Sequence, residues 1–67
     1  MIYDNDTKTL ILTTLDNLKQ VNNELNDKLN TLNGSIYSDD RETIRAIQNK
    51  NIETIQLIQK MELKGWI

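Results

Sequence analysis

The sequence contains no cysteine, histidine, proline or phenylalanine, and only two glycines among its 67 residues. Without cysteine no disulfide can form, and without cysteine and histidine the usual zinc ligands are missing. A chain of this length lies near the lower limit at which one hydrophobic core supports a fold. Association with other chains is therefore the support that we expect, and the absence of cysteine fits a reducing compartment.

No segment has the composition of a secretory signal or a membrane span. Residues 1–6 are acidic and lack a basic segment followed by an apolar one. No apolar run approaches the roughly 20 residues that a transmembrane helix needs. We therefore expect a cytoplasmic protein. The abundance of Asn, Ile, Lys and Asp, which have AT-rich codons, favours an origin in a low-GC bacterium, its phages or its plasmids.

The first half of the chain has the apolar spacing of a packed helix. Apolar residues recur at intervals of three and four, the pattern of a helix that buries one face along its length, at Ile11, Leu15, Leu18, Leu25, Leu29 and Leu32. Asp4, Asn5 and Asp6 suit an N-cap and first turn, where acidic groups are stabilised by the helix dipole. Asn33 and Gly34 suit its end, because glycine tolerates a left-handed C-cap. We predict a helix over about residues 5–33.

The second half has a broader stripe, which runs through Ile44, Ile47, Ile52, Ile55, Ile58 and Met61. Asp39 and Glu42 have capping-box spacing, and Ser38 is an alternative cap. Gly65 is a plausible end. We predict a second helix over about residues 39–64.

The whole chain, residues 1–67, is thus predicted to be one all-α domain, an antiparallel two-helix hairpin. A hairpin of this length is a thin rod whose two stripes cannot fully enclose each other, so we expect it to dimerise into a four-helix bundle. The residues that we expect this homodimer to bury are Leu15, Leu18, Leu25, Leu29, Ile44, Ile47, Ile55 and Ile58.

No arrangement of residues indicates catalysis, a metal site or a cofactor. The acidic groups at 4–6 and 39–42 suit helix N-termini, and neither has the glycine or the second acidic cluster of a cation site. A Ser–His pair is impossible without histidine. Arg41, Arg45 and the lysines alternate with acids, as on a solvated face. We expect no enzyme and no cofactor.

Two asparagines interrupt the apolar stripes. Asn22 and Asn51 fall at about the same level when counted outward from the turn. The structural interpretation is a buried polar layer that fixes register or oligomeric state. The alternative is a pair of amides that bind a ligand inside the bundle.

The two chain ends carry unusually large apolar residues. A hairpin brings Ile2 and Tyr3 to the same end as Trp66 and Ile67. They either cap the core or anchor a protein partner, since Trp and Tyr are frequent in interface hot spots. Leu57 points away from the main stripe and is a further candidate contact.

These features favour a small non-catalytic protein-binding module, such as an adaptor, inhibitor or antagonist of a larger protein. In size and plan the chain also resembles the small plasmid-borne helical-hairpin dimers that bind paired RNA loops, and that resemblance implies RNA binding. The net charge of −2 argues against a general nucleic-acid binder. A structural or assembly-chaperone subunit is a third hypothesis.

Overall fold

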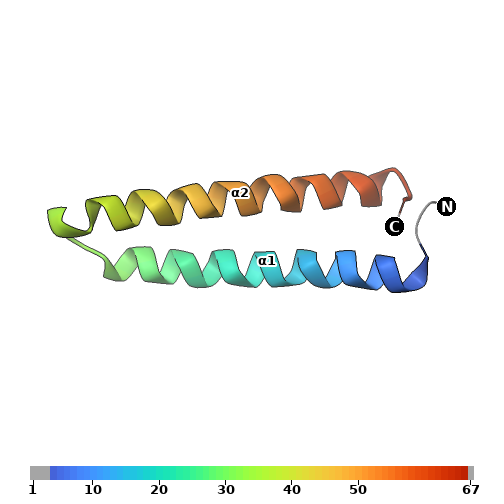
Figure 1. Ribbon diagram of the computed structural model, residues 1–67, viewed down its shortest axis with the longest axis horizontal. Helices are drawn as coiled ribbons and strands as arrows, with labels where there is room; N and C mark the ends of the chain where they lie inside the picture. Colours follow the sequence, from blue (N-terminus) through green and yellow to red (C-terminus); the bar gives the residue numbers. More distant parts are fainter. Residues whose placement is uncertain (1–3, 67) are drawn as a thin grey trace.

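The computed structural model describes residues 4–66 and consists of two long antiparallel helices (Figure 1). Helix α1 spans Asn5–Thr31 and helix α2 spans Ser38–Leu63, with a single 3-10 turn, η1, at Ser35–Tyr37 between them. The start of α1 and the end of α2 lie at one end of the rod. The predicted all-helical hairpin is confirmed, although α1 ends two residues earlier than predicted.

The N-terminus of α1 is capped as its sequence predicts. The carboxylate of Asp4 accepts a hydrogen bond from the backbone N–H of Thr7 at 2.7 Å, and the Asp4 carbonyl accepts from the N–H of Lys8 at 3.0 Å. One side chain and its own carbonyl thus satisfy two N–H groups of the first turn.

The C-terminus of α1 ends differently from the prediction. Its C-cap is Leu32, and Gly34 lies beyond it at φ +104° and ψ 158°, which is not a left-handed helical cap. Two carbonyls at this end are taken instead by Arg41 of α2. Its Nη1 donates to the carbonyl oxygens of Leu29 at 2.7 Å and Leu32 at 2.9 Å. The interpretation of Arg41 as a solvated residue was wrong.

The start of α2 has no side-chain cap. Neither the predicted capping box of Asp39 and Glu42 nor Ser38 provides one, and this expectation was wrong. The reason is η1, which runs directly into α2. The N–H of Ser38 donates to the Ser35 carbonyl, and Ser38 already has right-handed helical angles. A residue with those angles cannot act as an N-cap, whose backbone is extended.

Gly65 ends α2 as predicted. It has φ +73°, its N–H donates to the Glu62 carbonyl, and the N–H of Trp66 donates to the Met61 carbonyl, both at 3.0 Å. This pair of bonds is a Schellman motif, which requires a left-handed residue where Gly65 stands.

The core is a single seam between the helices. On α1 the residues that face α2 follow an unbroken heptad rhythm at Ile11, Leu15, Leu18, Asn22, Leu25, Leu29 and Leu32. Three side chains are almost fully enclosed: Leu15, Leu29 and Ile58, with 5%, 8% and 4% of their surface exposed. Leu15 lies seven residues before Asn22 and Ile58 seven after Asn51, so both belong to one layer of the seam.

The predicted stripe of α2 was wrong at two positions. Ile47 and Ile52 are 46% and 43% exposed, whereas Gln48 and Asn51 are half-buried against α1. The seam of α2 therefore runs through Arg41, Ile44, Gln48, Asn51, Ile55 and Ile58. Its polar residues are held there by the hydrogen bonds that they make to α1.

The rod measures 50 × 15 × 13 Å and has a radius of gyration of 15.2 Å. A compact domain of this length would have a radius of gyration of about 11 Å. The accessible surface is 5134 Å², compared with about 4400 Å² for a compact monomer of the same mass. The hairpin thus leaves an unusually large share of its chain exposed.

Candidate interaction surfaces

A polar layer crosses the middle of the seam. The Nδ2 of Asn51 donates to the Oδ1 of Asn22 at 2.7 Å, and the Nδ2 of Asn22 donates to the carbonyl of Gln48 at 3.3 Å. The Nε2 of Gln48 donates to the Asn22 carbonyl at 3.2 Å and to the Oδ1 of Asn26 at 2.6 Å. Asn22, Gln48 and Asn51 are half-buried and Asn26 is exposed.

The structure therefore brings Asn22 and Asn51 together, and it adds Gln48, which the sequence reasoning missed. The signal that could have found Gln48 is its place in the seven-residue rhythm of α2. Every bond in the layer joins α1 to α2, so the amides are already occupied by one another. This arrangement fixes the register of the hairpin and leaves the asparagine pair little capacity for a ligand.

The hairpin has two long sides, which differ in character. Each heptad of a helix places two residues in the seam. In an antiparallel pair, the residue just before the first of these two lies on one long side of the hairpin, and the residue just after the second lies on the other long side. A groove of about 510 Å³ on the second side is lined by residues of both helices, Lys19, Gln59, Glu62 and Leu63. We call this side the Lys19 face.

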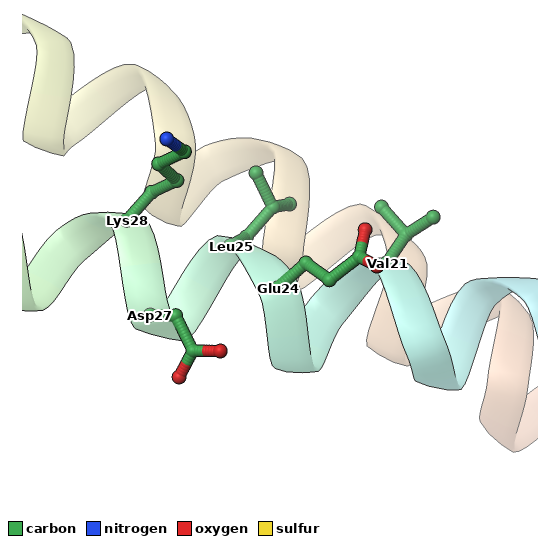
Figure 2. Close-up of a pocket in the computed structure, with 5 residues that line it drawn as sticks. All are labelled: Val21, Glu24, Leu25, Asp27 and Lys28. Carbon is green, nitrogen blue, oxygen red and sulfur yellow. The ribbon is translucent and has the colours of Figure 1, made fainter.

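The opposite side, which we call the Val21 face, carries most of the exposed apolar residues outside the turn and the chain ends. Its apolar members are Leu10, Val21, Ile47, Leu57 and the half-buried Met61. A groove of about 400 Å³ on this side is lined by α1 residues, Val21, Glu24, Leu25, Asp27 and Lys28. Figure 2 shows Val21, Leu25 and Lys28 directed to one side of α1, with Asp27 directed away.

Two threonines lie among these apolar residues with their hydroxyls already bonded. Thr14 Oγ1 donates to the Leu10 carbonyl at 2.8 Å, and Thr54 Oγ1 donates to the Lys50 carbonyl at 3.2 Å. Because each hydroxyl is satisfied within its own helix, covering these side chains would not leave an unpaired donor.

The Lys19 face is more polar. Its apolar residues are Leu12, Ile52 and Leu63, and between them lie Lys19, Asn26, Arg45 and Gln59, all exposed. Covering this side would remove two cationic groups and two amides from water, which is unfavourable unless each finds a partner.

Leu57, the predicted contact residue, is 59% exposed on α2. It lines a hollow of about 480 Å³ with Glu53, Gln56 and Lys60. Leu57 thus lies at the outer edge of the Val21 face, where apolar and charged surface meet.

The predicted cluster at the chain ends is described only in part. Ile2, Tyr3 and Ile67 lie outside the described residues. Trp66 is 38% exposed, and the Nζ of Lys64 lies 4.8 Å from the centroid of its ring, which is within range of a cation–π interaction. The Trp66 ring is therefore neither buried nor fully solvated.

Electrostatic features within residues 4–66 are modest. The single ion pair there joins Lys50 to Glu53 at 3.5 Å, and both side chains are largely exposed. The hydrogen bond from Thr7 holds the pKa of the Asp4 carboxyl below its ordinary value. In this part of the chain no group of three potential ligands is placed to hold a metal ion.

Neither described helix is long and apolar enough to cross a membrane. In comparisons with protein-family models, curated proteins and solved structures, no match to this chain was found.

Proposed function

We propose that this protein is a small non-catalytic protein-binding module, an adaptor, inhibitor or antagonist of a larger protein, and that it acts as a homodimeric four-helix bundle. One observation carries the proposal: within residues 4–66 the hairpin encloses three side chains and leaves nine large apolar ones exposed. Exposed apolar surface on a chain this small favours association with protein.

Self-association would compensate for the thin shape of the molecule. The rod is only 13 Å thick in its thinnest direction, so no side chain of the seam is far from solvent. A second hairpin laid along it would cover the half-buried residues of the seam and supply the core that a chain without disulfides lacks.

The larger protein, as distinct from a second copy of this chain, would bind at one end of the rod. Trp66 offers a large, partly exposed ring at the end where the helices begin and finish. Aromatic residues of this kind contribute strongly to interfaces, because they remove much apolar area from water at little cost in side-chain entropy. We propose Trp66 as the main partner contact and Leu57 as a second one. Ile67, which follows Trp66 in the sequence, and Ile2 and Tyr3 at the other chain end complete the proposed contact.

Two measurements test the proposal. Sedimentation equilibrium on the purified protein should show a dimer in the micromolar range, and a folded monomer at high micromolar concentration would contradict the dimer. Affinity capture from the native host, with proteins identified by mass spectrometry, should recover one partner in a fixed ratio to the bait.

The capture has a matched control. Trp66→Ala should lose the partner, whereas Leu63→Ala, at the same end and 90% exposed, should retain it. Equal retention by both variants would exclude Trp66 as the contact. Retention of RNA in place of a protein, sensitive to salt, would favour the nucleic-acid alternative.

A further inference from the structure

We infer that the second copy docks on the Val21 face, with the two hairpins pointing the same way and their turns at one end of the bundle. This inference rests on the proposed homodimer and adds to it which side of the hairpin is covered and in which orientation. It follows from the distribution of apolar residues, the available area and the placement of two charges.

The apolar residues select the side. Val21 and Ile47 lie on opposite helices next to the seam, and each is more than 40% exposed. Thr54 lies one heptad after Ile47 on the same side of α2, and its hydroxyl is already bonded to the Lys50 carbonyl. Among the positions that flank the seam, the Val21 face has two charged residues, Lys28 and Asp40, both near the turn. The Lys19 face has Leu12 and Ile52 but also four charged or amide residues, Lys19, Asn26, Arg45 and Gln59. The Val21 face is therefore the one that costs less to dehydrate.

The area is sufficient for a stable dimer. The outline of one long side of the rod, 50 × 15 Å, has a projected area of roughly 750 Å², close to the approximately 800 Å² per partner of a standard interface. A site for a short peptide or a small ligand would need only a fraction of that length. An elongated face that runs along both helices matches a second hairpin.

The charges select the orientation. Glu24 lies two residues from Asn22 in the direction of the turn, and Lys50 lies one residue from Asn51 in the same direction. Since Asn22 and Asn51 are hydrogen-bonded at the same level, Glu24 and Lys50 differ in height by only about 1.5 Å.

When both turns lie at one end, α1 of each copy faces α2 of the other. Glu24 of one hairpin then lies opposite Lys50 of its neighbour, and the two-fold axis makes this pair twice. When the copies are reversed end to end, each helix faces its own counterpart. Glu24 and Lys50 then lie on different helix pairs and cannot meet between the copies, so Lys50 keeps only its ion pair with Glu53 of its own helix.

Two isoleucines of nearly equal exposure give a matched test of the side. Ile47 and Ile52 are 46% and 43% exposed on the same helix, on the Val21 face and the Lys19 face respectively. Ile47→Lys should raise the dimer dissociation constant at least about tenfold in sedimentation equilibrium. Ile52→Lys should leave it within about threefold of the unaltered chain. Circular dichroism of each variant confirms that it remains helical.

The reverse result, with Ile52→Lys disruptive and Ile47→Lys neutral, would overturn the inference while the homodimer stands. A monomeric unaltered chain would overturn both. The charges give an independent test. Glu24→Lys and Lys50→Glu should each weaken the dimer, and the double variant should recover most of the loss. If the affinity losses of the two single variants simply add in the double variant, the Glu24–Lys50 pair between copies is excluded. This test can be read even if an isoleucine variant fails to fold.

The relative orientation of the two hairpins can be measured directly as the distance between their turns. Because the chain has no cysteine, Ser35→Cys introduces one spin label per copy on the exposed turn. Double electron–electron resonance should give one distance distribution below about 30 Å, since neighbouring helices in a bundle lie 8–10 Å apart. A distribution near 50 Å, the length of the rod, would show that the copies are reversed and would overturn the inference.

Discussion

The side-chain amides of Asn22 and Asn51 meet at 2.7 Å across the middle of the seam, with Asn51 as donor. The bond fixes the height of α1 against α2, because a shift of either helix by one heptad would place each amide opposite an apolar residue. Asn22 also donates to the Gln48 carbonyl at 3.3 Å, so the pair belongs to a small network.

Replacing both asparagines by leucine should raise the melting temperature and loosen the choice of oligomer, because apolar residues pack well at seam positions but do not discriminate register. Each single replacement should destabilise the protein by about 1 kcal/mol, since it leaves the remaining amide without its partner. Thermal unfolding of all four combinations gives the coupling between the two sites, and sedimentation reports the oligomers. A double variant that is less stable than either single variant would contradict this view.

Arg41→Met should destabilise the hairpin by about 1–3 kcal/mol, because it removes two charge-assisted hydrogen bonds but keeps an apolar stem in the seam. The Leu32 carbonyl would lose its Arg41 donor, and the Leu29 carbonyl would keep only the N–H of Leu32 at 3.3 Å. Urea unfolding measures the loss, and amide hydrogen exchange should increase first in the last turn of α1. Arg45→Met is the matched control, since Arg45 is exposed on the same helix, and it should change stability by less than about 0.5 kcal/mol.

Asp4 should make the first turn of α1 sensitive to acid. Its pKa is lowered in the folded chain, chiefly because the carboxylate accepts the N–H of Thr7. A lowered pKa contributes stability that is fully present above the pKa of the unfolded chain and is lost as the pH falls through the folded value.

Carbon-13 NMR titration of the Asp4 carboxyl should therefore give a midpoint below that of an unstructured peptide. Asp4→Asn keeps a capping oxygen and should remove this acid sensitivity while leaving the helix capped at neutral pH. A midpoint at or above the peptide value would show that the cap does not form.

Two variants at the end of α2 should separate the contribution of the Trp66 backbone to stability from the contribution of its ring. Deletion of residues 65–67 removes the two Schellman bonds to Glu62 and Met61 and should lower stability by about 1 kcal/mol. Trp66→Ala keeps both bonds and should have a smaller effect. Trp66 is the only tryptophan, so its fluorescence reports on this end alone. The emission should shift to the blue when the captured partner is added, and an unchanged spectrum would show that the ring stays out of the interface.

The sequence by itself determined the two helices, the place of the turn and the polar middle of the seam. These depend on local properties: the spacing of apolar residues, the absence of proline, a capping carboxylate at Asp4 and a glycine at 65 that can adopt a positive φ. The unbroken rhythm from Ile11 to Leu32 allowed only one face of α1 to pack. Asn22 was recognised because it stands in that rhythm.

Only the tertiary structure decided which face of α2 meets α1. Five isoleucines between residues 44 and 58 form one stripe about 140° wide, which is too broad for a single seam, since successive residues are about 100° apart around the helix. The hydrogen bonds of Gln48 and Asn51 to α1 hold the middle of this stripe in the seam and leave Ile47 and Ile52, at its two edges, exposed. The capping of α1 by Arg41 likewise depends on carbonyls 9 and 12 residues away along the chain, and no local pattern marks a contact that only the closed hairpin creates.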